Sequence, residues 1–257
     1  MRRGTAAIAA GALLIAAAAG IALWALSMGR AASAPDPCLG TDPPAAAAAD
    51  DGFAVDWAAW REVNPDVCGW VRVPGTGVSQ PVVAAPAEHP TFYLDHDVYG
   101  NWNVYGCPYL DAECEGGLLG SRLALVSGHH MDDGSMFSEL SSYEDAGWAA
   151  EHPWIDLYAP GEGGTTVHER RTVTCSRAVG AGEQAKRTSF RSGQELSAWL
   201  SEQAQAGTRI ADADGAERAV ALATCSTFTW DAHRDVVFAA SPCPLPTNEP
   251  YERTASR

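Results

Sequence analysis

Short runs of strand-forming residues, separated by Gly and Pro, dominate the chain from residue 69 to residue 240. Such runs are typical of β-strands joined by tight turns. One longer helical pattern interrupts them at about 192–206, where Leu196, Trp199 and Leu200 share a face. Many short strands with few helices predict a mainly β fold, closed as an antiparallel or mixed barrel. The strands are expected at 69–76, 78–83, 123–127, 155–159, 165–179, 219–223 and 235–240.

Residues 1–30 form a separate segment. Met-Arg-Arg opens the chain, and an uncharged stretch rich in Ala, Leu and Ile follows from Thr5 to Leu26. A stretch of this length is enough to cross the roughly 30 Å hydrocarbon core of a bilayer. We expect a retained membrane anchor whose N-terminus stays in the cytoplasm. A cleaved signal peptide is the alternative, because Arg-Ala-Ala-Ser-Ala at 30–34 offers small residues to a peptidase.

The rest of the chain divides by composition. Residues 31–52, rich in Ala and Pro, predict a flexible tether. A short amphipathic helix is expected from Phe53 to Val63, with Trp57 and Trp60 on its inward face. The globular domain is expected over 53–243, and residues 244–257 are expected to be a polar tail.

Charge and cysteine content bound the possible partners. The net charge of −15, from 32 acidic and 17 basic residues, argues against nucleic acid and against an anionic membrane surface. In an exported domain, seven cysteines leave at least one thiol unpaired if the others bridge. Cys107 and Cys114 are near enough to staple a hairpin, and zinc is disfavoured because no second pair lies nearby. Pairing stays open among Cys38, Cys68, Cys107, Cys114, Cys175 and Cys243.

Three chemical groups stand at the ends of predicted strands. Cys225 ends an apolar run, and a polar loop separates it from Arg234, so a hairpin can bring the two together. A thiol nucleophile, an imidazole that moves protons and an arginine that holds an oxyanion suffice for acyl transfer through a thioester. The ordinary alternative for Cys225 is a buried small hydrophobe or half of a disulfide.

The imidazole comes from Gly-His-His-Met at 128–131. Gly128 is expected to turn the chain sharply and to place His129 over the mouth of the barrel. A metal site at His129 and His130 is not expected, because adjacent residues of an extended segment point to opposite faces.

Together, Gly-His-His-Met-Asp-Asp-Gly-Ser-Met-Phe at 128–137, Thr224-Cys225 and Arg234 resemble the motifs of class B sortases. The resemblance spans about residues 53–240. It implies a closed sortase-type barrel of about eight strands, with an N-terminal helix and one inserted helix before the cysteine strand. By the same resemblance, Cys225 attacks a threonyl carbonyl, His129 is the general acid and base, and Arg234 positions substrate and stabilises the tetrahedral intermediate. Substrate-binding positions are expected at Leu94, Ala223 and Thr224.

The resemblance implies a membrane-anchored cysteine transpeptidase with its catalytic domain outside a Gram-positive cell. Such an enzyme cleaves a sorting motif of the Asn-Pro-x-Thr or Leu-Pro-x-Thr kind near the C-terminus of an exported protein. It transfers the acyl group to an amine of peptidoglycan or to a pilin lysine, and it needs no cofactor or metal. Two alternatives stay open: a cysteine peptidase that hydrolyses the same motif, and a non-catalytic surface assembly domain. The second alternative predicts that Cys225 is bridged to Cys175 or Cys243.

Overall fold

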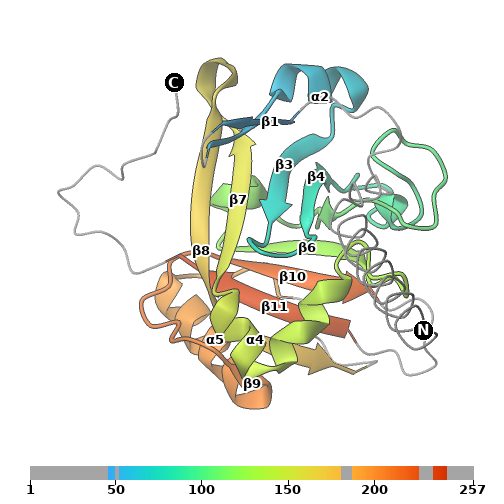
Figure 1. Ribbon diagram of the computed structural model, residues 1–257. Coiled ribbons are helices and arrows are strands. Elements are labelled where there is room, and N and C mark those ends of the chain that lie inside the picture. The colour runs from blue at the N-terminus through green and yellow to red at the C-terminus, as the bar shows by residue number, and fades with distance from the viewer. Residues whose placement is uncertain (1–45, 50–51, 181–186, 226–233, 242–257) are drawn as a thin grey trace, which may run out of the picture. The chain divides into compact units, whose positions relative to one another are not determined.

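The computed structural model describes residues 46–49, 52–180, 187–225 and 234–241 (Figure 1). All of them belong to one compact unit of the chain, Asp36–Arg257. The expected anchor at 1–30 and the expected polar tail at 244–257 lie outside the described residues. Within the described ranges, no helix combines the length and apolar character that a membrane crossing requires.

A closed mixed barrel forms the centre of the described domain. Its strands follow the order β11-β10-β6-β5-β4-β3-β7-β8, and β8 pairs with β11 to close the ring. The β10–β6 and β4–β5 pairs are parallel, and the other pairs are antiparallel. This confirms the expected mainly β barrel of about eight strands. The barrel strands are β3 (Val67–Arg72), β4 (Ser79–Ala84), β5 (Tyr109–Leu110), β6 (Leu123–His129), β7 (Trp154–Pro160), β8 (Thr166–Val179), β10 (Ala219–Cys225) and β11 (Arg234–Ala240).

Two helices occur in segments where the sequence predicts them, although the helix expected from Phe53 begins only at Trp57, because Gly52–Val55 form strand β2. Helix α2 (Trp57–Val63) begins after Asp56, whose carboxylate accepts a hydrogen bond from the amide of Ala59, and it buries Trp57 and Trp60. Helix α5 (Gly193–Ala206) begins after Ser192, whose hydroxyl accepts from the amide of Glu195. Each N-cap satisfies an otherwise unpaired amide, which explains why each helix starts there.

The shorter elements are not predicted by the hydrophobic pattern of the sequence, because one or two turns are too short to show a period. They are α3 (Gly117–Gly120), α4 (Ala146–Glu151), β9 (Thr208–Arg209) and the 3₁₀ helices η1 (Phe92–Leu94), η2 (Ser138–Glu144) and η3 (Glu162–Gly164). The segment expected as a tether, 31–52, contains strand β1 (Ala46–Ala49), which pairs with β2 (Gly52–Val55).

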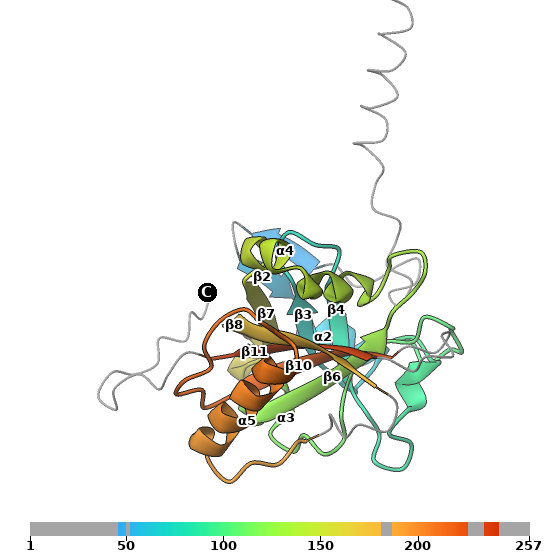
Figure 2. The same cartoon turned by 90° about the horizontal axis from the view of Figure 1, so that it is seen from below.

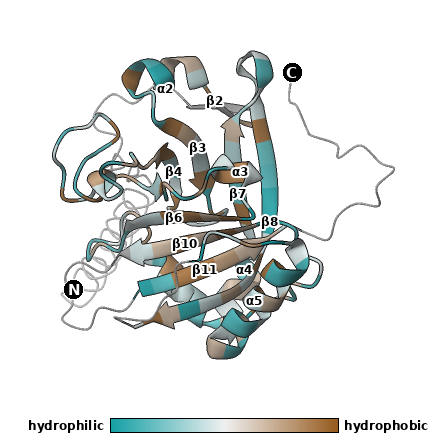
Figure 3. Ribbon diagram, turned by 180° about the vertical axis from the view of Figure 1, so that it is seen from behind, coloured by the Kyte–Doolittle hydropathy of each residue, from teal (hydrophilic) through white to brown (hydrophobic). Residues whose placement is uncertain are grey.

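Alternation along β10 separates two hydrophobic layers. Val220 and Leu222 pack inside the barrel, whereas Ala219, Ala221 and Ala223 face a second layer outside it. Helix α5 covers this outer layer with Leu196, Trp199 and Leu200. Figure 2 shows α5 lying close to β10 and β11, and in Figure 3 the same helix carries both hydrophobic and hydrophilic segments. Alanine on the outer face of β10 leaves room for the large side chains of the helix.

A disulfide staple between Cys107 and Cys114, which their spacing in the sequence would allow, is not present. Both residues are thiols, and their sulfur atoms have different neighbours. The sulfur of Cys107 lies 4.0 Å from the carbonyl oxygen of Pro81, and that of Cys114 lies 3.5 Å from the carbonyl oxygen of Leu123. Strand β5 comes between the two cysteines in the chain, so they lie on separate loops instead of on one hairpin.

Asp156 on β7 gives a pH-dependent test of the barrel wall. Burial by itself raises the pKa of this carboxyl, but hydrogen bonds from Arg170 and His168 outweigh it and lower the pKa to about 2. A lowered folded-state pKa stabilises the protein above the unfolded pKa near 4, and this contribution is lost as the pH falls from about 4 through 2. Asp156→Asn should therefore cost about 2 kcal/mol at neutral pH and progressively less in acid.

Urea unfolding of wild type and variant across this pH range measures the difference. Asp212→Asn, which removes an exposed ion pair with Arg209, is the matched control and should change stability by less than about 0.5 kcal/mol. A loss at Asp156 that stays constant down to about pH 2.5 would contradict the assignment.

Candidate active site

The ends of three neighbouring strands bring the predicted catalytic positions into one row. Strand β10 lies between β6 and β11, and Cys225 pairs with His129 in the parallel ladder. On the other side, Ala223 pairs with Val236. Cys225 lies two residues after Ala223 on β10, and Arg234 lies two residues before Val236 on the antiparallel β11, so these two positions are opposite each other. Neighbouring strands are about 5 Å apart, so the three backbone positions are adjacent.

All three positions belong to the same face of the sheet. On β10, Ala219, Ala221 and Ala223 contact the layer outside the barrel, and period-two alternation assigns position 225 to that face. By the same alternation, Val236 and Phe238 on β11 assign Arg234 to the face outside the barrel, and Leu123 on β6 assigns His129 to that face. Arg234 itself is exposed. The described part of Cys225 is its backbone in β10.

The His129 ring is held by a backbone carbonyl group. Its Nε2 atom lies 2.5 Å from the carbonyl oxygen of Leu94, and the residue is only 4% exposed. A carbonyl oxygen only accepts hydrogen bonds, so Nε2 carries the proton in the neutral ring and Nδ1 carries the lone pair. No described residue hydrogen-bonds Nδ1. Nδ1 therefore carries the lone pair of a ring of fixed orientation, and this atom is itself buried in the described part of the structure.

Of the expected substrate-binding positions, Leu94 lies beside His129 through this same contact. Ala223 and Thr224 are both buried, at 6% and 1% exposure. The methyl group of Ala223 packs in the layer under α5, and the hydroxyl of Thr224 accepts a hydrogen bond of 2.8 Å from the Asp235 amide. These two side chains support the strand ends around Cys225, and a role for any of the three residues in substrate binding stays a prediction.

The prediction of a sharp turn at Gly128 is wrong. Gly128 lies within β6 and pairs with Thr224, so the strand continues through it to His129. The glycine is needed for a different reason: a Cβ atom here would lie 2.8 Å from the ring of Phe137, which is fully buried. Sequence inspection missed Phe137 as a support of the histidine strand, because the contact joins a strand to the segment after its following loop.

A disulfide between Cys225 and Cys175 is incompatible with the strand register. Cys175 pairs with Phe238, which pairs with Ala221, and Cys225 lies four residues beyond Ala221. Two strand spacings and four residues of strand separate the two backbones by roughly 16 Å. A disulfide requires Cα atoms within about 7 Å. Cys175 is a buried thiol, and burial raises its pKa to about 11. Cys243, the other proposed partner, lies outside the described residues.

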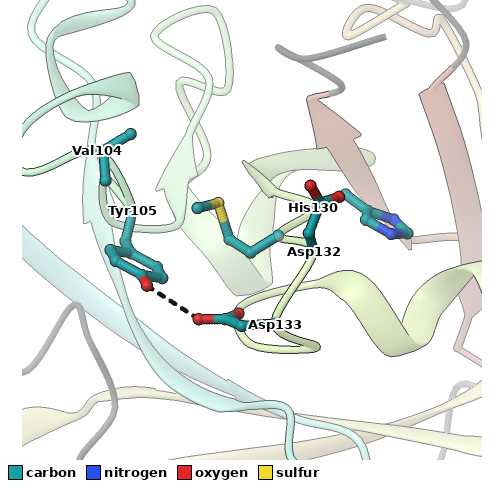
Figure 4. A pocket seen from close by; sticks show the side chains of 6 residues that line it. Val104, Tyr105, His130, Asp132 and Asp133 are labelled. Atoms are coloured by element: carbon teal, nitrogen blue, oxygen red, sulfur yellow. Dashed lines mark hydrogen bonds between the residues drawn. The ribbon is translucent and has the colours of Figure 1, made fainter.

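Two cavities lie at opposite ends of β6. One of about 280 Å³ lies next to His129 in sequence and is lined by Val104, Tyr105, His130, Met131, Asp132 and Asp133 (Figure 4). The other, of about 440 Å³, includes Ser121 and Arg122 at the start of the strand, roughly 20 Å away. Among the described residues, no group of three or more His, Cys, Asp or Glu side chains has a geometry that could hold a metal ion.

Sequence comparison relates part of the chain to class B sortases. It is 27% identical over 109 residues to Sortase B of Listeria monocytogenes and 28% identical over 97 residues to Sortase B of Staphylococcus aureus. These matches cover 42% and 38% of this chain and the same shares of the two relatives, so they span less than half of the relatives' length. No protein-family model matches the chain.

The fold of these proteins is shared more widely than the sequence. Staphylococcus aureus sortase B in complex with substrate superposes with a TM-score of 0.60 and 22% identity, covering 73% of this chain and 85% of that structure. Clostridium perfringens sortase B superposes with a TM-score of 0.61 and 23% identity, covering 71% and 97%. The described domain therefore has the fold of class B sortases, and the expected resemblance is confirmed.

The contact between Gly128 and Phe137 predicts a specific epistasis. Gly128→Ala should destabilise the protein by about 1–3 kcal/mol, because the added methyl group overpacks the space against the ring. In Gly128→Ala with Phe137→Leu, the smaller side chain relieves the clash, so the double variant should lose less stability than the sum of the singles. Thermal or urea unfolding of the four proteins measures the coupling. Additive losses would mean that the two residues do not oppose each other.

Proposed function

We propose that this chain is a cysteine transpeptidase of the sortase kind. One observation carries the proposal: His129, Cys225 and Arg234 occupy adjacent register positions on one face of three neighbouring strands, in a barrel with the class B sortase fold. The sequence similarity to two proteins named Sortase B supports the same activity.

In the proposed first step, the thiolate of Cys225 attacks the threonyl carbonyl carbon of a sorting motif. Arg234 stabilises the oxyanion of the tetrahedral intermediate, because a guanidinium group offers several hydrogen-bond donors and a positive charge. His129 in its protonated form donates from Nδ1 to the leaving amine, so the peptide C–N bond breaks and a thioester remains on Cys225. The Leu94 carbonyl keeps Nε2–H engaged throughout, which leaves Nδ1 as the atom that exchanges protons.

In the second step, an amine attacks the thioester carbon, the C–S bond breaks, and Nδ1 of His129 takes the proton released. The motif is of the Asn-Pro-x-Thr or Leu-Pro-x-Thr kind, and the acceptor is an amine of peptidoglycan or a pilin lysine. Leu94, Ala223 and Thr224 are proposed to form the part of the substrate site next to Cys225. The chemistry needs neither metal nor cofactor.

The proposed location follows from the apolar composition of residues 5–26. This segment anchors the protein in the cell membrane with a single pass, and the catalytic domain works on the outer side of a Gram-positive envelope. There the enzyme meets both the exported substrate and the cell-wall amine.

Acyl-enzyme formation tests the function directly. The full chain, purified in detergent, is incubated with a pool of Asn-Pro-x-Thr and Leu-Pro-x-Thr peptides and examined by intact-mass analysis beside Cys225→Ala. We expect an acyl adduct on the wild type alone, discharged faster by added amine than by water. Discharge by water at the same rate would indicate a cysteine peptidase, and a Cys225 bridged to Cys243 would indicate the non-catalytic assembly domain.

Arg234 is the second test. Arg234→Ala should lower kcat/KM for acylation by roughly 10²–10³, the usual cost of losing one oxyanion donor. Arg234→Lys should recover only part of this loss, because an ammonium group lacks the planar fork of donors. Arg209→Ala, which changes an exposed arginine on β9, is the matched control and should keep wild-type kinetics. Equal activity of the alanine variant and the wild type would remove Arg234 from the mechanism.

A further inference from the structure

The carbonyl group that holds the His129 ring belongs to a very short element. Leu94 is the last residue of the 3₁₀ helix η1, which has three residues. A helix of this length gains little rigidity from its own backbone, because a single turn has only one or two internal hydrogen bonds. The position of the Leu94 carbonyl therefore depends on what holds η1 against the rest of the domain.

The middle residue of η1, Tyr93, is anchored through its hydroxyl group. The hydroxyl donates a hydrogen bond of 2.7 Å to the Oδ2 atom of Asp66 and accepts one of 2.8 Å from the Nδ2 atom of Asn64. The same amide group of Asn64 also donates to the carbonyl oxygen of Val98, at 2.8 Å. Burial raises the pKa of the Tyr93 hydroxyl above its ordinary value, so the group stays protonated and keeps its bond to Asp66.

These bonds tie η1 to the start of the barrel. Asn64 is the C-cap of α2, and Asp66 directly precedes β3. Tyr93 is 3% exposed and Asn64 is 7% exposed. Hydrogen bonds in such an interior hold their partners firmly, because a group that loses its partner there is also cut off from water.

A glycine packs directly against the backbone of the anchored residues. A Cβ atom at Gly106 would lie 2.5 Å from the carbonyl oxygen of Tyr93 and 2.6 Å from that of Leu94. The next residue, Cys107, donates its amide to the carbonyl oxygen of Tyr93 at 2.9 Å. Tyr93 and Leu94 are consecutive, so any shift of the anchored residue also moves the carbonyl group that contacts His129.

We propose that Tyr93 is a positioning residue for His129. Its hydroxyl group, held by Asn64 and Asp66, keeps the carbonyl oxygen of Leu94 within hydrogen-bonding distance of the Nε2 atom. The inference rests on the proposed function, since it concerns the imidazole that moves protons in that reaction. Reaction rates depend steeply on such geometry, and a displacement of about 1 Å is enough to cost a hundredfold.

Tyr93→Phe tests the inference, because it removes the hydroxyl and keeps the ring. Acylation of the full chain in detergent is followed with the peptide that the pool identifies. The kcat for acylation should fall about tenfold and KM should change by less than about twofold, because proton transfer is impaired and the peptide site is not. Tyr143→Phe is the matched control, since it removes a buried hydroxyl that donates to the carbonyl oxygen of His152 at 2.7 Å, between η2 and the end of α4. It should lower the urea midpoint by a similar amount and keep the wild-type kcat.

A spectroscopic measurement separates positioning from a loss of stability and needs no substrate. In protein labelled with ¹⁵N-histidine, the Nε2–H signal of His129 is assigned by its absence from His129→Gln. Its proton should exchange slowly with water in the wild type. Tyr93→Phe should speed this exchange about tenfold, because the hydrogen bond to Leu94 is weakened. Tyr143→Phe should stay within about twofold of the wild type.

The partner of the hydroxyl gives a rescue experiment. Asp66→Asn keeps an oxygen that accepts from Tyr93 and should retain at least about half of the wild-type kcat, whereas Asp66→Ala should match Tyr93→Phe. Combining Asp66→Ala with Tyr93→Phe should lower kcat no further than the second change alone, because both remove the same bond.

Three results would overturn the inference. An equal loss of kcat in Tyr93→Phe and Tyr143→Phe, in proportion to the lost stability, would make Tyr93 a structural residue only. An unchanged exchange rate in Tyr93→Phe would mean that its hydroxyl does not hold the Leu94 carbonyl. A wild type that forms no acyl-enzyme with any peptide removes the proposed function and the positioning role with it, even where the exchange rates show that the hydroxyl holds the ring of His129.

Discussion

The parallel pairing of β10 with β6 is the constraint on which the candidate site depends. Its register sets Cys225 opposite His129, and the antiparallel pairing with β11 continues the row to Arg234. A slip of one residue on any of these strands would move its chemical group to the barrel interior, because strand side chains alternate between faces. The register is therefore as important for the proposed chemistry as the identity of the residues.

Packing on both faces of the sheet holds that register. Inside the barrel, Val220 and Leu222 interlock with Val126 and Val237, and outside it the alanines of β10 lie under α5. A shifted strand would place alanine in the barrel and valine or leucine under the helix, leaving voids on one side and clashes on the other. Near the site, the Thr224 hydroxyl bonds to the Asp235 amide, which joins β10 to β11 close to their functional ends.

The described thiols and the imidazole of His129 lie in different surroundings. Burial raises the pKa of the Cys68 thiol to about 12 and that of Cys175 to about 11, so both stay protonated and unreactive near neutral pH. His129 is buried too, but its Nε2–H has the Leu94 carbonyl as a partner, whereas its Nδ1 has no hydrogen-bond partner among the described residues.

Local pattern was enough to predict much of this protein. Glycine and proline spacing indicated the strands, and the Leu196, Trp199 and Leu200 face indicated α5. The strand-end positions of His129, Cys225 and Arg234 led to a catalytic prediction, and the structure places these three positions side by side. These predictions depend on residues near one another in sequence, where periodicity and turn chemistry act. Short elements such as β5 and α4 carry no period and were missed.

Only the tertiary structure decided how these segments meet. It replaced the expected turn at Gly128 with a continuous strand against Phe137, separated Cys107 from Cys114, and set Cys175 too far from Cys225 for a disulfide. It also joined the Leu94 carbonyl to His129 and brought the loop of Val104 and Tyr105 to Asp133. Each of these contacts links residues that are distant in sequence or lie across a loop. Their geometry follows from strand register and close packing, which no local pattern of residues specifies.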